Sequence, residues 1–195
     1  MDFKKLANQY RDELLDNVLP FWLEHSQDLE FGGYFSCLDR EGKVFDTDKF
    51  IWLQGREVWM FSMLYNKVEK RQEWLDCAVQ GGEFLKKYGH DGNYNWYFSL
   101  DRSGRPLVEP YNIFSYTFAT MAFGQLSLAT GSQEYADIAK KTFEIILSKV
   151  DNPKGKWNKL HPGTRNLKNF ALPMILCNPA MEIEHILGKD YLEQA

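Results

Sequence analysis

One face of an otherwise apolar segment carries two aromatic side chains and a guanidinium group. Trp52, Arg56 and Trp59 stand at positions i, i+4 and i+7 of the run FIWLQGREVWMFSMLYNKV. A helix would therefore place all three on the same side. Aromatic rings stack on the CH faces of sugars, and an arginine donates hydrogen bonds to hydroxyl or carbonyl oxygens. The spacing therefore suits recognition of a polar, sugar-like ligand.

Arg56 also has a structural interpretation. An arginine in an apolar helix is costly unless it is paired or faces water. A salt bridge to Asp46, to Asp48 or to a neighbouring glutamate would satisfy it. A position facing a hydrated cavity would satisfy it equally well, and the sequence leaves both open.

The chain repeats itself. YFSCLDREG at residues 34–42 returns as YFSLDRSG at 97–104, and each stretch has the Asp and Gly of a hairpin turn. EWLDCA at 73–78 returns as EYADIA at 134–139 and as DYLEQA at 190–195. The repeating unit is therefore about sixty residues long.

Two kinds of predicted helix alternate along the chain. Three are amphipathic, with one apolar face, and cover residues 2–27, 72–87 and 132–149. Three are apolar nearly all round and cover residues 50–68, 112–130 and 167–187. A helix of the second kind must be buried on most faces. The pattern predicts an all-α fold of the (α/α)6-toroid type, with apolar helices inside and short β-hairpins on one rim. An open solenoid of helix pairs is the alternative.

Three helix pairs and the start of a fourth make about half of a six-pair ring, within a single domain of residues 1–195. A truncated gene product and a part of a longer protein both fit this count. Half a toroid exposes helix faces that a full ring would bury. We therefore expect association, as a homodimer that closes a ring or as aggregates.

The repeat also extends the candidate site. A shift of 62 positions places Trp52 on Phe114, so the same level of the cavity would again be aromatic. Alternatively, both rings belong to the core.

Composition excludes several classes of protein. The net charge is −4 and the basic residues are scattered, which argues against nucleic acid or an anionic membrane as partner. No apolar run is long enough to span a bilayer, and the charged first helix does not resemble a secretory signal. Cys37, Cys77 and Cys177 are odd in number and lack the spacing of metal ligands. They indicate reduced thiols in a cytoplasmic protein, with no metal site.

Four stretches resemble the N-acylglucosamine 2-epimerase family. They are GGYFSCLDREGKVFDTDK, DKFIWLQGREVWMFSMLYN, IFSYTFATMAFGQLSLATG and HPGTRNLKNFALPMIL. Members of the family are (α/α)6 barrels about twice as long, related in architecture to the six-hairpin glycosidases. They interconvert N-acetylglucosamine and N-acetylmannosamine, and relatives act on cellobiose or mannose. The resemblance implies an isomerase of carbohydrate metabolism that removes and returns a proton at C2 and requires no cofactor.

The resemblance also assigns roles to residues. It implies that Arg56 is the catalytic arginine that holds the substrate oxygen, and that Trp52 is the aromatic residue four positions before it. Trp59 and Phe114 are the further candidates for substrate binding. Phe114 stands where relatives acting on cellobiose often have tyrosine, which favours the N-acylglucosamine branch.

A nucleotide activator is a further implication of the resemblance. Residues 162–173 are similar to a loop that contributes to binding a nucleotide such as ATP in some members. Arg165 and Lys168 would then contact phosphate. A basic, solvated loop is an equally good interpretation.

The proton-transfer residues of the family have no counterpart here. Two histidines do this work in the second half of the family's fold, and His25, His90, His161 and His185 do not match them. We therefore expect the 195-residue chain alone to be inactive. The alternative is a non-catalytic half-barrel that binds carbohydrate or protein. A glycosidase is disfavoured, because no pair of carboxylates begins the inner helices.

Overall fold

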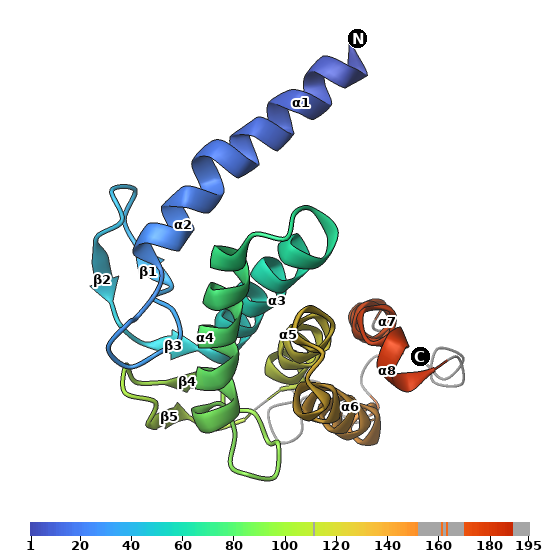
Figure 1. The fold of residues 1–195 in the computed structure, drawn as a ribbon. Helices are drawn as coiled ribbons and strands as arrows, with labels where there is room; N and C mark the ends of the chain where they lie inside the picture. Colours follow the sequence, from blue (N-terminus) through green and yellow to red (C-terminus); the bar gives the residue numbers. More distant parts are fainter. Residues whose placement is uncertain (111, 152–160, 162, 164–169, 189–195) are drawn as a thin grey trace.

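The computed structural model describes residues 1–110, 112–151, 161, 163 and 170–188 (Figure 1). Its helices are α1 (Phe3–Glu13), a π-helical turn η1 (Leu14–Val18), α2 (Leu19–His25), α3 (Ile51–Lys67), α4 (Gln72–Tyr88), α5 (Phe114–Thr130), α6 (Gln133–Ser148), α7 (Ala171–Glu182) and α8 (Glu184–Leu187). Its strands are β1 (Cys37–Leu38), β2 (Val44–Asp46), β3 (Lys49–Phe50), β4 (Ser99–Leu100) and β5 (Pro106–Val108). No helix among the described residues is long and apolar enough to cross a membrane.

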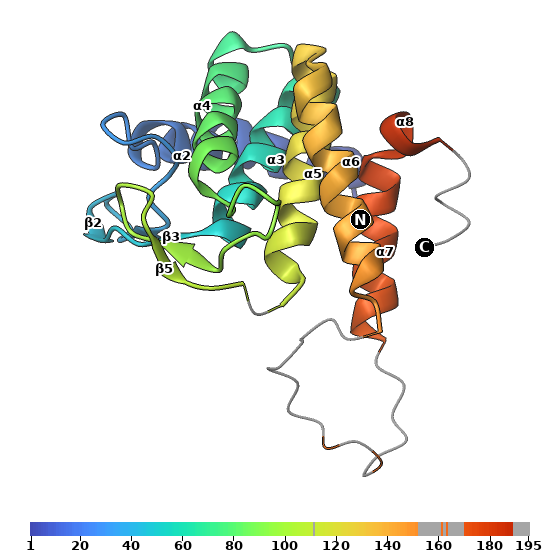
Figure 2. The ribbon, with the colours of Figure 1, turned by 90° about the horizontal axis from the view of Figure 1, so that it is seen from below.

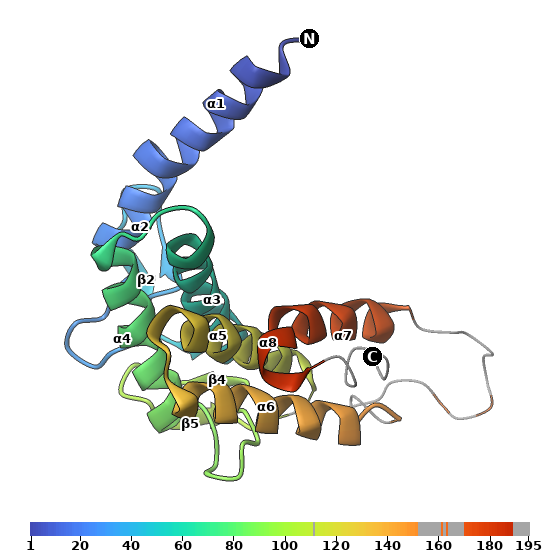
Figure 3. The same ribbon diagram turned by 45° about the vertical axis from the view of Figure 1, so that its right-hand side comes forward.

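The helices form two layers, as the alternating pattern predicted. The inner helix α5 packs against α3 on one side and α7 on the other (Figures 1 and 3). The outer helices α4 and α6 cover α3 and α5, and the view in Figure 2 shows the hairpins together at one end of the helices. The packing of the helices therefore confirms the predicted half of an α/α toroid.

The inner helices approach one another closely because glycine stands at the contacts. A Cβ atom on Gly55 of α3 would lie 2.9 Å from the backbone of Phe118 in α5. A Cβ atom on Gly124 of α5 would lie 2.4 Å from a methyl carbon of Ile183, next to α8. Both separations are too short for real atoms, so a side chain at either position would push the helices apart.

Helices α4, α5 and α6 are buried as expected for the outer and inner layers. The helices at the two ends of the structure, α1 and α7, are more exposed than expected. Helix α5 is buried along most of its length, whereas α4 and α6 bury one face each. Helix α7 buries only three residues, Leu176, Pro179 and Ala180. The expectation that this inner segment is buried on most faces is therefore wrong for α7. The reason is that α5 covers one side of it and no described helix covers the opposite side.

Helix α1 is the other exception. It projects from the helical body (Figures 1 and 3), and none of its residues is buried. Its predicted apolar face exists but is uncovered, with Tyr10 70% exposed. The amphipathic pattern thus identified the helix, while the described chain holds nothing that covers it.

The repeated sequence forms two repeated hairpins. Strand β1 pairs with β2, and β4 pairs with β5. The carboxylates of Asp39 and Asp101 accept hydrogen bonds from backbone N–H groups of their own turns. Gly42 and Gly104 close these turns with φ angles of 85° and 94°, which favour glycine. Strand β3 also pairs with β4, so the start of α3 is joined to the second hairpin.

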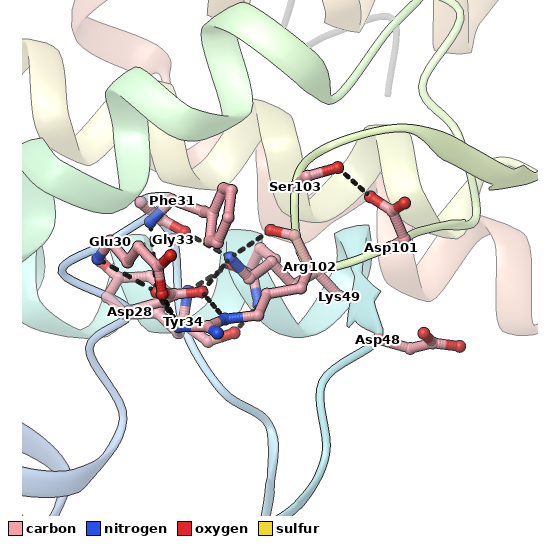
Figure 4. A network of polar contacts seen from close by, with 12 residues as sticks. Asp28, Glu30, Phe31, Gly33, Tyr34, Asp48, Lys49, Asp101, Arg102 and Ser103 are labelled. Atoms are coloured by element: carbon pink, nitrogen blue, oxygen red, sulfur yellow. Dashed lines mark hydrogen bonds and ion pairs between the residues drawn. The ribbon is translucent and has the colours of Figure 1, made fainter.

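A buried ion cluster holds this rim together (Figure 4). The ammonium group of Lys49 lies 2.9 Å from Asp28 Oδ2, and both side chains are fully buried. Arg102 donates to the two oxygens of Asp28 over 2.9 and 3.0 Å. Burial alone would raise the pKa of Asp28, but hydrogen bonds from Arg102, Lys49 and the Phe31 N–H lower it to about 2.

Replacing Asp28 with asparagine should destabilise the chain strongly. The substitution leaves the buried Lys49 without its counter-charge, a change that typically costs about 3–5 kcal/mol. The measurement is urea unfolding followed by circular dichroism. Glu69→Gln is the control, because it breaks the exposed Arg71–Glu69 pair and should cost less than about 1 kcal/mol. Equal losses in the two variants would show that the cluster is not structural.

Candidate functional site

An open cavity of about 440 Å³ lies between the inner helices. Three of the four predicted sugar-site residues line it, namely Trp52 and Arg56 from α3 and Phe114 from α5. Its other lining residues are Phe98, Asn112, Ser115, Phe118 and Ile175. The cavity therefore brings together the two positions that the 62-residue shift related.

Arg56 faces this cavity and lies against aromatic rings. Its guanidinium carbon is 4.5 Å from the centre of the Phe118 ring and 5.2 Å from that of Trp52. Such placement stabilises a cation by about 0.5–2 kcal/mol. Among the described residues, no carboxylate forms an ion pair with Arg56, so the salt bridge to Asp46 or Asp48 is not formed. Its donors are left facing the exposed cavity.

Phe114 is fixed where α5 begins. Asn112 Oδ1 accepts a hydrogen bond from the Phe114 N–H over 2.9 Å, which satisfies one of the free N–H groups at the start of the helix. The ring remains 38% exposed. Phe118 lies one turn further along α5, and its place four residues after Phe114 is a signal that could have identified it.

Trp59 is not among the residues that line the cavity. It follows Trp52 by two turns, roughly 10 Å along the helix axis. Its indole Nε1 is buried without a hydrogen-bond partner among the described residues. Although Trp52, Arg56 and Trp59 share one face of the helix, only the first two line the cavity.

The histidines lie elsewhere. His25 contacts Phe21 within the α2 segment, and His90 stacks on Tyr94. His185 lies 3.1 Å from Ser127 Oγ. Burial lowers the pKa of His90 and of His185, and none of the four histidines lines the cavity. Arg165 and Lys168, the predicted nucleotide contacts, lie outside the described residues.

A second, smaller groove lies on the other side of Arg56. It measures about 170 Å³ and runs between α2 and α3. Its lining residues are Trp22, Ser36, Leu53, Arg56, Glu57 and Met60. Arg56 is the residue that both hollows share.

Glu57 gives this groove an unusual chemistry. Its Oε1 atom is buried and accepts no hydrogen bond from the described residues. Burial raises the pKa of Glu57 to about 8, although a hydrogen bond with Ser26 opposes the shift. The carboxyl group is therefore largely protonated at neutral pH. This residue was not singled out from the sequence, and its position beside the arginine in an apolar helix was the available signal.

Across the part of the chain that the structure describes, no three or more His, Cys, Asp and Glu side chains are grouped so that they could hold an ion. Cys37, Cys77 and Cys177 are free thiols.

The layered helices, with Arg56 in the inner layer, define half of an α/α toroid. The profile of the N-acylglucosamine 2-epimerase (GlcNAc 2-epimerase) family matches residues 33–195. The N-acylglucosamine 2-epimerase of Bos taurus is 42% identical over 169 residues, which are 84% of this chain and 40% of the relative. The cellobiose 2-epimerase of Dictyoglomus turgidum is 29% identical over 167 residues, 81% of this chain and 42% of the relative.

A solved structure repeats the same architecture. Cellobiose 2-epimerase from Bacillus thermoamylovorans superposes with a TM-score of 0.80 at 22% identity, covering 98% of this chain and 53% of that one. The chain belongs to the N-acylglucosamine 2-epimerase family. It spans about two fifths of the length of the curated relatives it matches.

Replacing Glu57 with glutamine should flatten the pH dependence of stability. The pKa of Glu57 in the folded chain, about 8, exceeds its ordinary value of 4.5. The stabilising effect of its proton is thus complete below pH 4.5 and is lost as the pH rises through 8. The difference in unfolding free energy between Glu57→Gln and the native chain should therefore grow by about 4 kcal/mol from pH 5 to pH 8.5, as the native chain loses stability.

Urea unfolding at a series of pH values measures this change. Glu144→Gln is the matched control, because Glu144 is exposed on α6 and its substitution should leave the native profile unchanged. Parallel profiles for the native chain and Glu57→Gln would mean that the carboxyl group is hydrated rather than buried.

Proposed function

We propose that this chain is the substrate-positioning half of a sugar 2-epimerase that interconverts N-acetylglucosamine and N-acetylmannosamine. The observation that carries the proposal is the placement of Arg56. Its guanidinium lies against two aromatic rings, has no carboxylate partner among the described residues and faces a cavity large enough for a monosaccharide. Family membership supports the reaction class.

The arginine suits the chemistry of this reaction. In the open-chain sugar, removal of the C2 proton moves the electron pair onto the C1 carbonyl oxygen and produces an enolate. A guanidinium that donates to this oxygen stabilises the negative charge as it develops. Return of a proton to the opposite face of C2 inverts the configuration, and the atoms balance without a cofactor. Trp52 and Phe114 would hold the carbon skeleton through their ring faces.

The proton-transfer groups would come from outside this chain. None of its histidines lines the cavity, and histidine is the side chain whose pKa best suits proton exchange near neutral pH.

The N-acylglucosamine branch is supported by 42% identity to the bovine relative against 29% to the cellobiose-acting one. We also propose cytoplasmic action, and ATP-type activation through Arg165 and Lys168.

The isolated chain should not exchange the C2 proton of N-acetylmannosamine. That proton is a very weak acid, and its removal requires a positioned base. Proton NMR in heavy water reports even the first half of the reaction. Bovine N-acylglucosamine 2-epimerase, measured under the same conditions, is the positive control. Exchange that depends on the isolated chain would reveal a base within these residues. It would contradict the proposal that the proton-transfer groups come from outside this chain.

Arg56 is tested best in a complete ring. Residues 1–195 can replace the matching part of the bovine relative, and the chimera should epimerise N-acetylmannosamine. Arg56→Lys in the chimera should lower kcat/KM about a hundredfold with little change in melting temperature, because lysine keeps the charge but lacks the planar fork. The control is Arg71→Lys at an exposed surface pair. An inactive chimera that binds sugar would favour the non-catalytic alternative.

A further inference from the structure

The cavity that Arg56 faces is also lined by two polar side chains that the proton transfer does not use. They are Asn112, just before α5, and Ser115, in the first turn of that helix. Ser115 is 3% exposed, and its hydroxyl group has no hydrogen-bond partner among the described residues. Asn112 accepts the Phe114 N–H through Oδ1, while its Nδ2 donates to no group in the described part of the chain. An amide donor and a hydroxyl group are therefore available to a ligand.

These two side chains lie at a different level of the cavity from Arg56. Gly55, next to Arg56 in α3, packs against Phe118 of α5. Ser115 precedes Phe118 by three residues, which is about 4.5 Å along the helix axis, and Asn112 lies still closer to the start of α5. A ligand atom held by Arg56 is thus a few ångströms deeper in the cavity than the two polar groups.

The substituent on C2 of an N-acylated sugar matches this arrangement. When Arg56 holds the C1 oxygen, C2 is the neighbouring carbon, and its acylamino group spans a few ångströms. That group has a carbonyl oxygen, an N–H and a methyl group. Asn112 Nδ2 can donate to the carbonyl oxygen, and Ser115 Oγ can accept from the N–H. The Phe114 ring, 38% exposed at the same level, can cover the methyl group.

A hydroxyl group on C2 does not replace the acylamino group. It is too short to reach both side chains at once, and it has no methyl group to place against Phe114. A site that hydrogen-bonds part of its substrate discriminates against an analogue lacking that part, because its own polar groups are then left unpaired. The cavity therefore favours a 2-acylamino sugar over a 2-hydroxy sugar such as mannose.

We propose that Asn112 and Ser115 are specificity-determining residues that bind the N-acyl group of the substrate, with Phe114 against its methyl group. The assignment rests on the proposed function, which places the C1 oxygen at Arg56. Neither Asn112 nor Ser115 moves the C2 proton or contacts the C1 oxygen. Their substitution therefore changes which sugar is bound, whereas substitution of Arg56 changes turnover.

Asn112→Asp separates recognition from folding. Aspartate keeps an oxygen that accepts the Phe114 N–H and suits the start of a helix, but it replaces the amide donor with an acceptor. The isolated chain is titrated with N-acetylmannosamine and with mannose, and binding is followed by saturation-transfer difference NMR. The native chain should prefer N-acetylmannosamine about tenfold, with the strongest transfer at the acetyl methyl protons. Asn112→Asp should reduce this preference to about twofold or less.

Two further variants keep the test decisive. Ser115→Ala should reduce the preference about threefold, and it serves where circular dichroism shows that Asn112→Asp is unfolded. Asn93→Asp is the matched control, because it adds the same charge at an exposed loop residue and should bind both sugars as the native chain does. Equal affinity of the native chain for the two sugars would overturn the assignment. So would an absence of N-acetylmannosamine binding, or an unchanged preference in both cavity variants.

The bovine chimera distinguishes this assignment from the proposed function. In the chimera, Asn112→Asp should raise KM for N-acetylmannosamine about tenfold and change kcat less than KM, since it removes binding rather than proton transfer. A chimera that epimerises N-acetylmannosamine with unaltered KM in Asn112→Asp and Ser115→Ala would refute the acyl site and leave the epimerase function. A chimera that does not epimerise, beside an isolated chain that binds the acyl group as described, would refute the epimerase function and leave the acyl site.

Discussion

The buried contact among Asp28, Lys49 and Arg102 is the interaction on which the working end of the molecule depends. Three segments meet there: the loop after α2, the strand that leads into α3 and the turn of the second hairpin. Lys49 lies two residues before Ile51, where the first inner helix begins. Its ammonium group also donates to the carbonyl oxygens of Gly32 and Arg102. A fully buried lysine is tolerated only with such complete pairing, and the pairing fixes where α3 begins and hence which residues its first turns direct toward the cavity.

Arg56 and Glu57 are adjacent residues of one apolar helix, and their side chains lie in different environments. Arg56 lies against aromatic rings and faces the open cavity. Glu57 turns about 100° away into a groove where burial favours its neutral form. A pair of adjacent ionisable residues thus places a guanidinium toward the open cavity and a protonated acid toward the groove between α2 and α3. The two hollows share the arginine as their common wall.

The layered architecture follows from sequence because it rests on local pattern. Alternation of one-sided and all-round apolar helices, and the repeated Asp–Gly turns, specify α3 to α6 and both hairpins. The ion cluster could not be predicted in this way, since its members are 21 and 74 residues apart and no local rule pairs them. Trp59 shows a second limit, because helical spacing defines a face but not the depth at which a cavity ends. Helices α1 and α7 show a third, since a pattern reveals an apolar face without revealing what covers it.

The pairing of β3 with β4 couples the repeats and affects how the chain is made. In a simple helical repeat, each unit folds on its neighbour as it emerges. Here Lys49 donates to the carbonyl of Gly32 within the first unit, but it reaches the carbonyl of Arg102 only 53 residues later. At ordinary rates of synthesis this delay lasts about 3–10 s. Throughout that interval the first unit has been translated but its buried cation is incompletely paired, so the nascent first helix pair stays open to chaperones and proteases until the second hairpin arrives.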